Sequence, residues 1–162
     1  MLAQELIQEY QQEAETTKRV LERVPEAQLT WKPHEKSMTL GRLSQHIAEL
    51  PQWVARSLTM DEFVFGTGPY KPVIPETHAQ IMQTYEKNLG EAVAALGTAT
   101  DAKLATTWKV KKGDVLISER QRAVSIRREL RHLVHHRGQL SVYLRLLNIP
   151  VPPIFGPTAD ER

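Results

Sequence analysis

The sequence predicts an all-α fold, an antiparallel four-helix bundle followed by an extended C-terminal tail. Three observations support this prediction. Four long segments carry apolar residues at spacings of three and four, few segments have the character of strands, and 162 residues are enough to bury a core without disulfides or a structural metal. We therefore expect residues 1–162 to form a single domain.

The first two helices are predicted over residues 2–24 and from about residue 39 to residue 58. Each has one apolar stripe of the kind that faces a core. Pro25 ends the first helix, because proline lacks the amide hydrogen and crowds the preceding turn. Ser37 or Thr39 serves as the N-cap of the second helix. Pro51 removes one backbone hydrogen bond, so we expect a kink there.

The third helix is predicted to begin at Thr77, because Thr77 and Gln80 have the spacing of a capping box. Gly97 ends its apolar stripe. The fourth helix is predicted over residues 120–147 and ends before Pro150.

The segments between the helices have less regular patterns. Residues 61–75 contain two glycines and three prolines and are predicted to form a loop. Its aromatic residues either wall a pocket or close over the bundle as a hydrophobic clasp: Phe63, Phe65 and Tyr70. Residues 108–110 and 115–117 are compatible with a short hairpin. The tail from residue 151 has three prolines and is expected to be extended along the bundle.

Composition excludes several classes of protein. The chain has no cysteine, which rules out disulfides, thiolate-bound zinc, iron–sulfur clusters and a cysteine nucleophile. Its six histidines and its carboxylates remain as metal ligands. The formal charge is +2 with acidic and basic residues interspersed, so we expect no nucleic-acid partner. The opening residues do not resemble a signal peptide and no apolar run is long enough to span a membrane, so we expect a cytoplasmic protein without a membrane partner.

Three histidines are predicted to point into the interior of the bundle. At about 100° per residue, His132 and His136 lie one turn apart on the face of the fourth helix that carries its leucines. His46 lies on the inward edge of the second helix, whereas His135 lies outside the core face. One buried histidine is commonly a hydrogen-bonded core residue, but three imidazoles need partners for all their nitrogens, and one divalent metal ion satisfies three at once. We therefore predict a metal site formed by His46, His132 and His136.

Residues near these histidines are candidates for orienting ligands or transferring protons. Glu129 precedes His132 by three residues and is expected to accept a hydrogen bond from a ligand ring or to pair with an arginine, with metal ligation as the lesser alternative. Gln139 could orient a ligand ring or a bound water. The candidates for a general acid or base are Glu129, Gln139, Tyr143 and His135. Zinc or nickel suits an imidazole site, with iron and manganese as alternatives. Arg137 and Arg145 are expected to be solvated.

Two strings carry a family resemblance: WKPHEKSMTLGRLSQHIAEL at residues 31–50 and LRHLVHHRGQLSVYLRLLNIPVPPIFGPTADE at residues 130–161. With them the chain resembles the DinB/YfiT-like family of metalloenzymes over nearly its whole length. The HxxHHRGQ string, combined with one earlier histidine, is the specific part of the match. The resemblance implies a four-helix bundle, often dimeric, whose divalent ion is held by the residues that match the family's three histidines: His46, His132 and His136.

Function is less specified than fold. The resemblance implies either a transferase or isomerase that uses a low-molecular-weight thiol or a metal-dependent hydrolase, acting on a small-molecule substrate. We expect a metal-dependent enzyme, with the thiol-dependent S-transferase type favoured and the thiol as a second cofactor. In either reaction the open position of the ion would lower the pKa of a bound thiol or water. The alternative is a noncatalytic metal-binding or dimerisation protein of the stress response, so enzymatic activity stays open.

Overall fold

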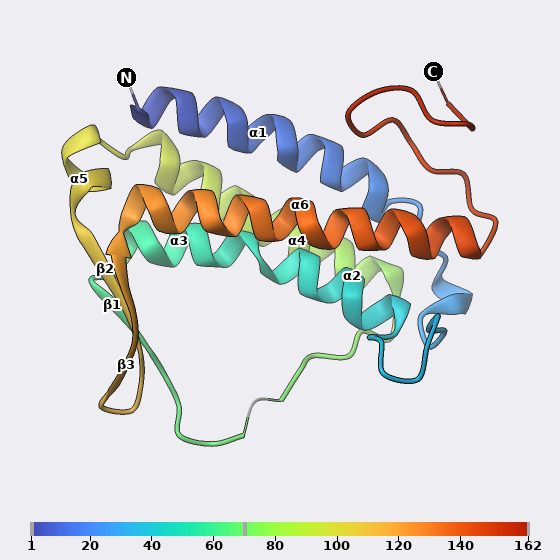
Figure 1. Ribbon diagram of the computed structural model, residues 1–162, viewed down its shortest axis with the longest axis horizontal. Coiled ribbons are helices and arrows are strands. Elements are labelled where there is room, and N and C mark those ends of the chain that lie inside the picture. The colour runs from blue at the N-terminus through green and yellow to red at the C-terminus, as the bar shows by residue number, and fades with distance from the viewer. Residues whose placement is uncertain (1, 70, 162) are drawn as a thin grey trace.

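The computed structural model describes residues 2–69 and 71–161. The helices pack side by side, with two shorter ones following each other end to end in one row, and a small sheet lies at one end of them (Figure 1). In chain order the elements are α1 (Leu2–Leu21), η1 (Glu26–Gln28), α2 (Leu40–Glu49), α3 (Pro51–Thr59), β1 (Glu62–Phe65), α4 (His78–Gly97), α5 (Asp101–Ala105), β2 (Thr107–Lys112), β3 (Val115–Gln121) and α6 (Arg122–Leu146).

The expectation of an all-α four-helix bundle is wrong, because the fold includes a three-stranded mixed sheet in the order β1-β2-β3. The hairpin is confirmed, and its strands are longer than residues 108–110 and 115–117. Strand β1 lies in the segment predicted to be loop, and it pairs in parallel with β2, with Glu62 opposite Lys109 and Phe65 opposite Lys112. Strand β1 forms by pairing with residues more than forty positions later in the sequence. The local pattern of residues 61–75 therefore does not predict this strand.

Local signals placed most helix boundaries correctly. Thr39 is the N-cap of α2, and its hydroxyl accepts a hydrogen bond from the amide of Arg42. Thr77 and Gln80 form a complete capping box at the start of α4. Pro51 does more than kink the second helix. It occupies the first turn of a separate helix, α3, where a missing amide hydrogen leaves no intrahelical acceptor unpaired.

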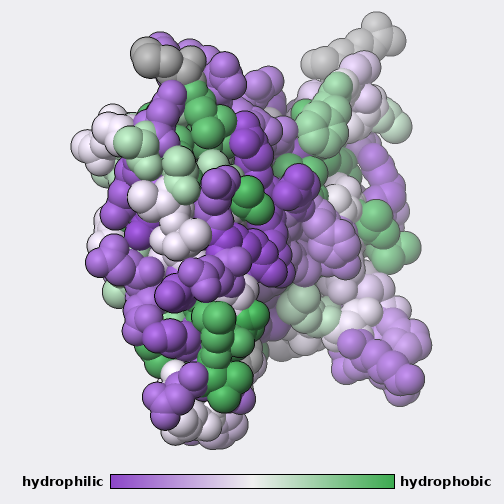
Figure 2. Space-filling view, turned by 60° about the vertical axis from the view of Figure 1, so that its left-hand side comes forward, coloured by the Kyte–Doolittle hydropathy of each residue, from purple (hydrophilic) through white to green (hydrophobic). Residues whose placement is uncertain are grey.

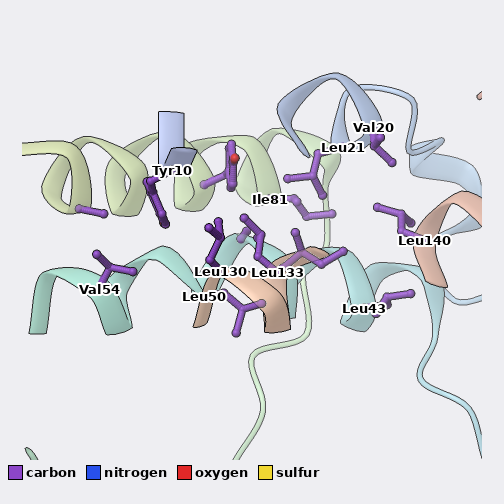
Figure 3. Packing of buried hydrophobic residues seen from close by; sticks show 14 of the residues in the cluster. Tyr10, Val20, Leu21, Leu43, Leu50, Val54, Ile81, Leu130, Leu133 and Leu140 are labelled. Carbon is purple, nitrogen blue, oxygen red and sulfur yellow. The ribbon is translucent and has the colours of Figure 1, made fainter. Parts of the chain in front are cut away.

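The core lies where the helices meet. Figure 3 shows side chains of α1, α2, α3, α4 and α6 pointing toward one another, among them Tyr10, Val54, Ile81 and Leu130. Burying such side chains stabilises the fold by about 1.5–3 kcal/mol each. Tyr85 is fully buried as well, and its hydroxyl donates a hydrogen bond to the carbonyl of Ala14 at 2.6 Å, so α4 is also tied to α1 through the one polar atom of that ring.

Two buried arginines connect helices to distant segments, and both roles escaped the sequence pattern. Arg122, at the start of α6, donates to the carbonyls of Ser57 and Met60 at the end of α3. Arg137 was expected to be solvated, but it is 1% exposed and forms an ion pair with Glu13 of α1. A periodic pattern marks which face of a helix is polar, but it does not show that a partner on another helix buries that face.

The C-terminal tail forms no helix or strand over its described residues, yet it is not extended as predicted. It turns back on itself, because the hydroxyl of Thr158 donates to the carbonyl of Val151 at 2.7 Å. Asp160 accepts hydrogen bonds from Arg145 and from the amide of Val151. Arg145 is exposed, as expected, and its ion pair with Asp160 also anchors this turn. Figure 1 shows the hooked tail beyond the end of α6.

The surface is mostly hydrophilic, and hydrophobic side chains gather over the sheet (Figure 2). They belong largely to β3, where at least half of the surface of three consecutive residues is exposed: Val115 at 68%, Leu116 at 50% and Ile117 at 54%. Along the described residues, every helix is too short or too polar to serve as a membrane span.

Candidate metal centre

The structure brings together the three histidines that the sequence singled out. His132 and His136 project from α6 and His46 projects from α2, and one nitrogen of each ring lies within 4.8 Å of the others. The i, i+4 spacing places the first two rings one turn apart on the same face. His136 is 8% exposed, and the other two are half-buried. The predicted convergence of two helices on one point is therefore present, while metal ligation itself stays a prediction.

The rings of the cluster lie in direct contact. The centroid of His46 is 4.6 Å from that of His136 and 5.2 Å from that of His132, with the ring planes steeply inclined. The Nε2 atoms of His132 and His136 are 2.9 Å apart. This separation is that of a hydrogen bond, which needs a proton on one of the two nitrogens.

The outer nitrogens of the two α6 histidines each face an acceptor. Nδ1 of His136 lies 2.7 Å from Oε1 of Gln139, and Nδ1 of His132 lies 3.4 Å from Oε2 of Glu129. An oxygen acceptor places the proton of a neutral imidazole on Nδ1, so both Nε2 atoms present lone pairs to the same small space. In this arrangement of protons, a cation between the two Nε2 atoms would satisfy both lone pairs. The donor set therefore fits a metal ion.

The electrostatic environment also favours neutral rings. Burial, together with the neighbouring histidines and Arg42, lowers the pKa of His46 from 6.5 to about 4. Burial likewise lowers the pKa of His136, partly opposed by its hydrogen bond to Gln139. A metal binds the unprotonated form of imidazole, so these two rings are in the ligating state at neutral pH.

A large cavity lies against the cluster. It has a volume of about 1220 Å³ and is lined by His46 and His132, by residues of α2, α3 and α4, and by the inner face of the sheet. The aromatic rings of Trp53, Phe65 and Trp108 form part of its wall. The expectation that the segment after α3 contributes to a pocket is therefore correct for Phe65. Phe63 contacts Trp53 but does not itself line the cavity, and Tyr70 lies outside the described residues.

The four candidates for proton transfer occupy different positions. Glu129 lines the cavity and also pairs with Arg128 at 3.0 Å, while Gln139 contacts His136. His135 is exposed and its ring lies 4.9 Å from that of His136, on the outer side. Tyr143 donates a hydrogen bond to the carbonyl of Met38 at 3.2 Å and packs edge-on against Trp31. The structure thus brings only Glu129 and Gln139 into hydrogen-bond contact with the cluster.

Sequence reasoning missed Arg56 and its neighbour Trp53, which both line the cavity. Their spacing of three residues on one helix was the available signal, because a cation and an aromatic ring three apart lie on the same face. It also missed Glu49, which lines the cavity and accepts hydrogen bonds from Arg42 at 3.2 Å.

Comparisons with known proteins identify the family and the fold. The sequence model of the DinB family matches residues 1–161. A DinB-like protein from Bacillus cereus is 25% identical in sequence and has a TM-score of 0.72, with 93% of this chain and 95% of that chain covered. No curated protein matches the sequence.

A second solved structure has the same fold at lower sequence identity. The DinB-like protein YjoA from Bacillus subtilis is 16% identical, with a TM-score of 0.68 over 98% of this chain and 99% of that chain. The family match spans both helices that carry the histidine cluster. With the helices, the cluster and the match over almost every residue in agreement, the chain belongs to the DinB family.

Proposed function

We propose that His46, His132 and His136 bind one divalent metal ion and that the chain is a metal-dependent enzyme. The observation that supports this most directly is the pair of Nε2 atoms of His132 and His136, 2.9 Å apart with both outer nitrogens facing acceptors. His46 supplies a third imidazole in reach of the same point. Zinc or nickel suits this donor set best, and iron or manganese is the alternative.

Three protein ligands leave a coordination position for an exogenous group, where a divalent ion lowers the pKa of a bound thiol or water. Residues of the chain prepare this position. Glu129 and Gln139 fix the orientation of two rings, and burial keeps His46 unprotonated. Glu129 also lines the cavity, so its carboxylate is the residue best placed to accept a proton from a ligand.

We favour a thiol-dependent S-transferase over a hydrolase because of the size of the cavity. Pockets for one drug-sized ligand occupy about 300–1,000 Å³. The cavity here, at about 1220 Å³, has room for a low-molecular-weight thiol and an acceptor molecule together. A hydrolase needs room for only one organic substrate and water, so it is the second candidate.

Metal content and turnover test the proposal. We expect about one equivalent of zinc or nickel per chain, with nitrogen ligands and at least one non-protein ligand in the X-ray absorption spectrum. Transfer of glutathione or L-cysteine to monochlorobimane reports the S-transferase, and cleavage of 4-nitrophenyl acetate reports the hydrolase. The His135→Ala variant is the matched control, because its ring lies outside the cluster. A protein that binds no divalent ion contradicts the proposal.

The noncatalytic alternative makes a different prediction for metal removal. If the ion is structural, a chelator unfolds the helices and no substrate is turned over. If the ion is catalytic, circular dichroism stays unchanged on chelation while turnover is lost and returns with added zinc. The extensive apolar contacts between the helices favour the second outcome, because they do not depend on the histidines.

The family resemblance also leads us to propose a homodimer that acts on a small molecule. Light scattering tests the assembly, with an expected mass of two 18.5 kDa chains. A monomer at all accessible concentrations contradicts this part of the proposal.

A further inference from the structure

The cavity beside the histidine cluster has an excess of positive charge. Among the described residues that line it, two are carboxylates, Glu49 and Glu129, and six are cationic: Arg56, Lys71, Lys87, Lys112, Arg120 and Arg128. Both carboxylates already have cationic partners, because Glu49 pairs with Arg42 and Glu129 pairs with Arg128. The whole chain has a formal charge of only +2, so the concentration of cations here is local.

Arg56 is the cation that aromatic rings hold in place. Its guanidinium carbon lies 5.0 Å from the centroid of Trp53 and 4.5 Å from that of Phe63. These two rings contact each other edge-on at 5.0 Å, and both contact Phe65. The guanidinium therefore lies over a three-ring aromatic cluster that limits its freedom to move.

The donors of Arg56 lack acceptors within the protein. No described residue forms a hydrogen bond or an ion pair with its guanidinium, although the side chain is half-buried and burial lowers its pKa. Glu91 acts on it only through long-range attraction. The buried arginines Arg122 and Arg137 differ, because each binds at least one backbone carbonyl and a carboxylate. A partly desolvated guanidinium with free donors fits a planar anion from outside.

We propose that Arg56 is the anchor for an anionic group, a carboxylate or a phosphate, on the small molecule that occupies this cavity. The apolar part of that molecule packs against Trp53, Phe65 and Trp108, and its opposite end reaches the histidine cluster. As a statement about the substrate, this inference rests on the proposed function. As a statement about ligand binding, it depends only on the cavity and Arg56.

Arg56 and the histidine cluster lie at separate places along the cavity. His46 and Arg56 are ten residues apart in two consecutive helices, α2 and α3, which separates their backbone positions by about 15 Å along the helices at 1.5 Å per residue. Figure 1 shows the segment between β1 and α4 passing below these two helices, on the side where residues of that segment line the cavity. A molecule whose anionic group lies away from its reacting end fits these two positions.

Two fluorescent probes that differ by one charged group test the proposal. The anionic probe is 8-anilino-1-naphthalenesulfonate, and N-phenyl-1-naphthylamine has the same rings without the sulfonate. We expect Arg56→Gln to weaken binding of the anionic probe about tenfold, the effect of losing one charge-assisted hydrogen bond, and to leave the neutral probe unchanged. Arg56→Lys retains the charge, so its affinity for the anionic probe should fall less than that of Arg56→Gln. Arg19→Gln, which removes an exposed charge from α1, is the matched control.

Each remaining outcome of the titration overturns the inference. Equal loss of both probes in Arg56→Gln would mean that Arg56 only supports the aromatic wall. An unchanged affinity for the anionic probe, or no binding of it by the unmodified chain, would mean that Arg56 is not an anion anchor. Binding of the neutral probe and the melting temperature show that each variant is folded.

Further arms of the titration separate this inference from the metal proposal and identify the anion. The titration is repeated with added zinc and after chelation. The Arg56 effect should persist in both, and loss of the anionic probe on chelation alone would assign its sulfonate to the metal and overturn the inference. Failure to bind zinc leaves the Arg56 result intact. Displacement of the anionic probe by benzoate or by phenyl phosphate then distinguishes carboxylate from phosphate recognition.

Discussion

The guanidinium of Arg137 lies 2.6 Å from the carboxylate of Glu13 and joins the middle of α6 to α1. Arg137 also donates to the carbonyl of Glu13 and to the hydroxyl of Thr17. Arg137 follows His136 directly in the sequence. Its buried contacts therefore hold the turn of α6 that carries His136. The network therefore contributes to stability and to the position of the cluster at once.

Arg137→Ala should destabilise the fold by about 3–5 kcal/mol, because it leaves the carboxylate of Glu13 in a largely buried place without its partner. Urea unfolding followed by circular dichroism measures the change. Lys18→Ala provides the contrast, since it removes an exposed ion pair with Glu86 and should change stability little. Equal effects of the two substitutions would contradict the role given to the buried network.

His132→Ala or His136→Ala should remove most of the bound metal while the helical content stays the same. The apolar residues of α6 pack against the core without the two rings. Removing either ring should therefore reduce metal binding and leave the helices folded. Metal analysis beside circular dichroism checks both parts. His135→Ala should retain the metal, because this residue is exposed. Undiminished metal in both of the first two variants would refute the assignment of the ligands.

Gln139→Leu should weaken zinc binding about 10–100-fold, because the outer nitrogen of His136 loses the acceptor that fixes its tautomer. A competition titration with a chromophoric chelator measures the affinity. Gln8→Leu, at an exposed position on α1, is the control and should have no effect. If the two variants bind zinc equally well, the hydrogen bond to Gln139 does not prepare the ring for a metal.

The turn in the tail should come apart in acid. The hydrogen bonds from Arg145 and from the amide of Val151 hold the pKa of Asp160 below its ordinary value. A carboxyl with a depressed pKa contributes its stabilisation above its ordinary pKa of about 4, and loses it as the pH falls through the depressed value. The amide resonance of Val151 should therefore shift below about pH 4. In Asp160→Asn this transition should be absent, and its persistence there would assign it to another group.

Much of the candidate site could be predicted because it depends on local geometry. The period of an α-helix alone places His132 and His136 on one face and His135 on another, whatever packs around them. His46 was found in the same way, since α2 also has a clear apolar stripe. The sequence could not show how far apart the two helices lie, so the distance between His46 and the α6 pair needed the structure.

What could not be predicted depends on contacts between distant segments. Strand β1 exists because β2 supplies its hydrogen-bond partners, and Arg137 is buried because Glu13 lies opposite it on α1. The division of the second helix at Pro51 was not predicted for another reason. A proline is compatible both with a kink in one helix and with the first turn of a new helix, so the sequence does not distinguish the two.

The cluster joins two histidines of one helix, α6, to a third histidine on a second helix, α2. His132 and His136 keep their spacing whenever α6 is helical, but His46 comes from a point 132 − 46 = 86 residues earlier in the chain. An ion held by all three would act as a reversible staple across that long loop, resisting its opening much as a covalent cross-link does. The tightness of metal binding would then report how firmly α2 is docked on α6.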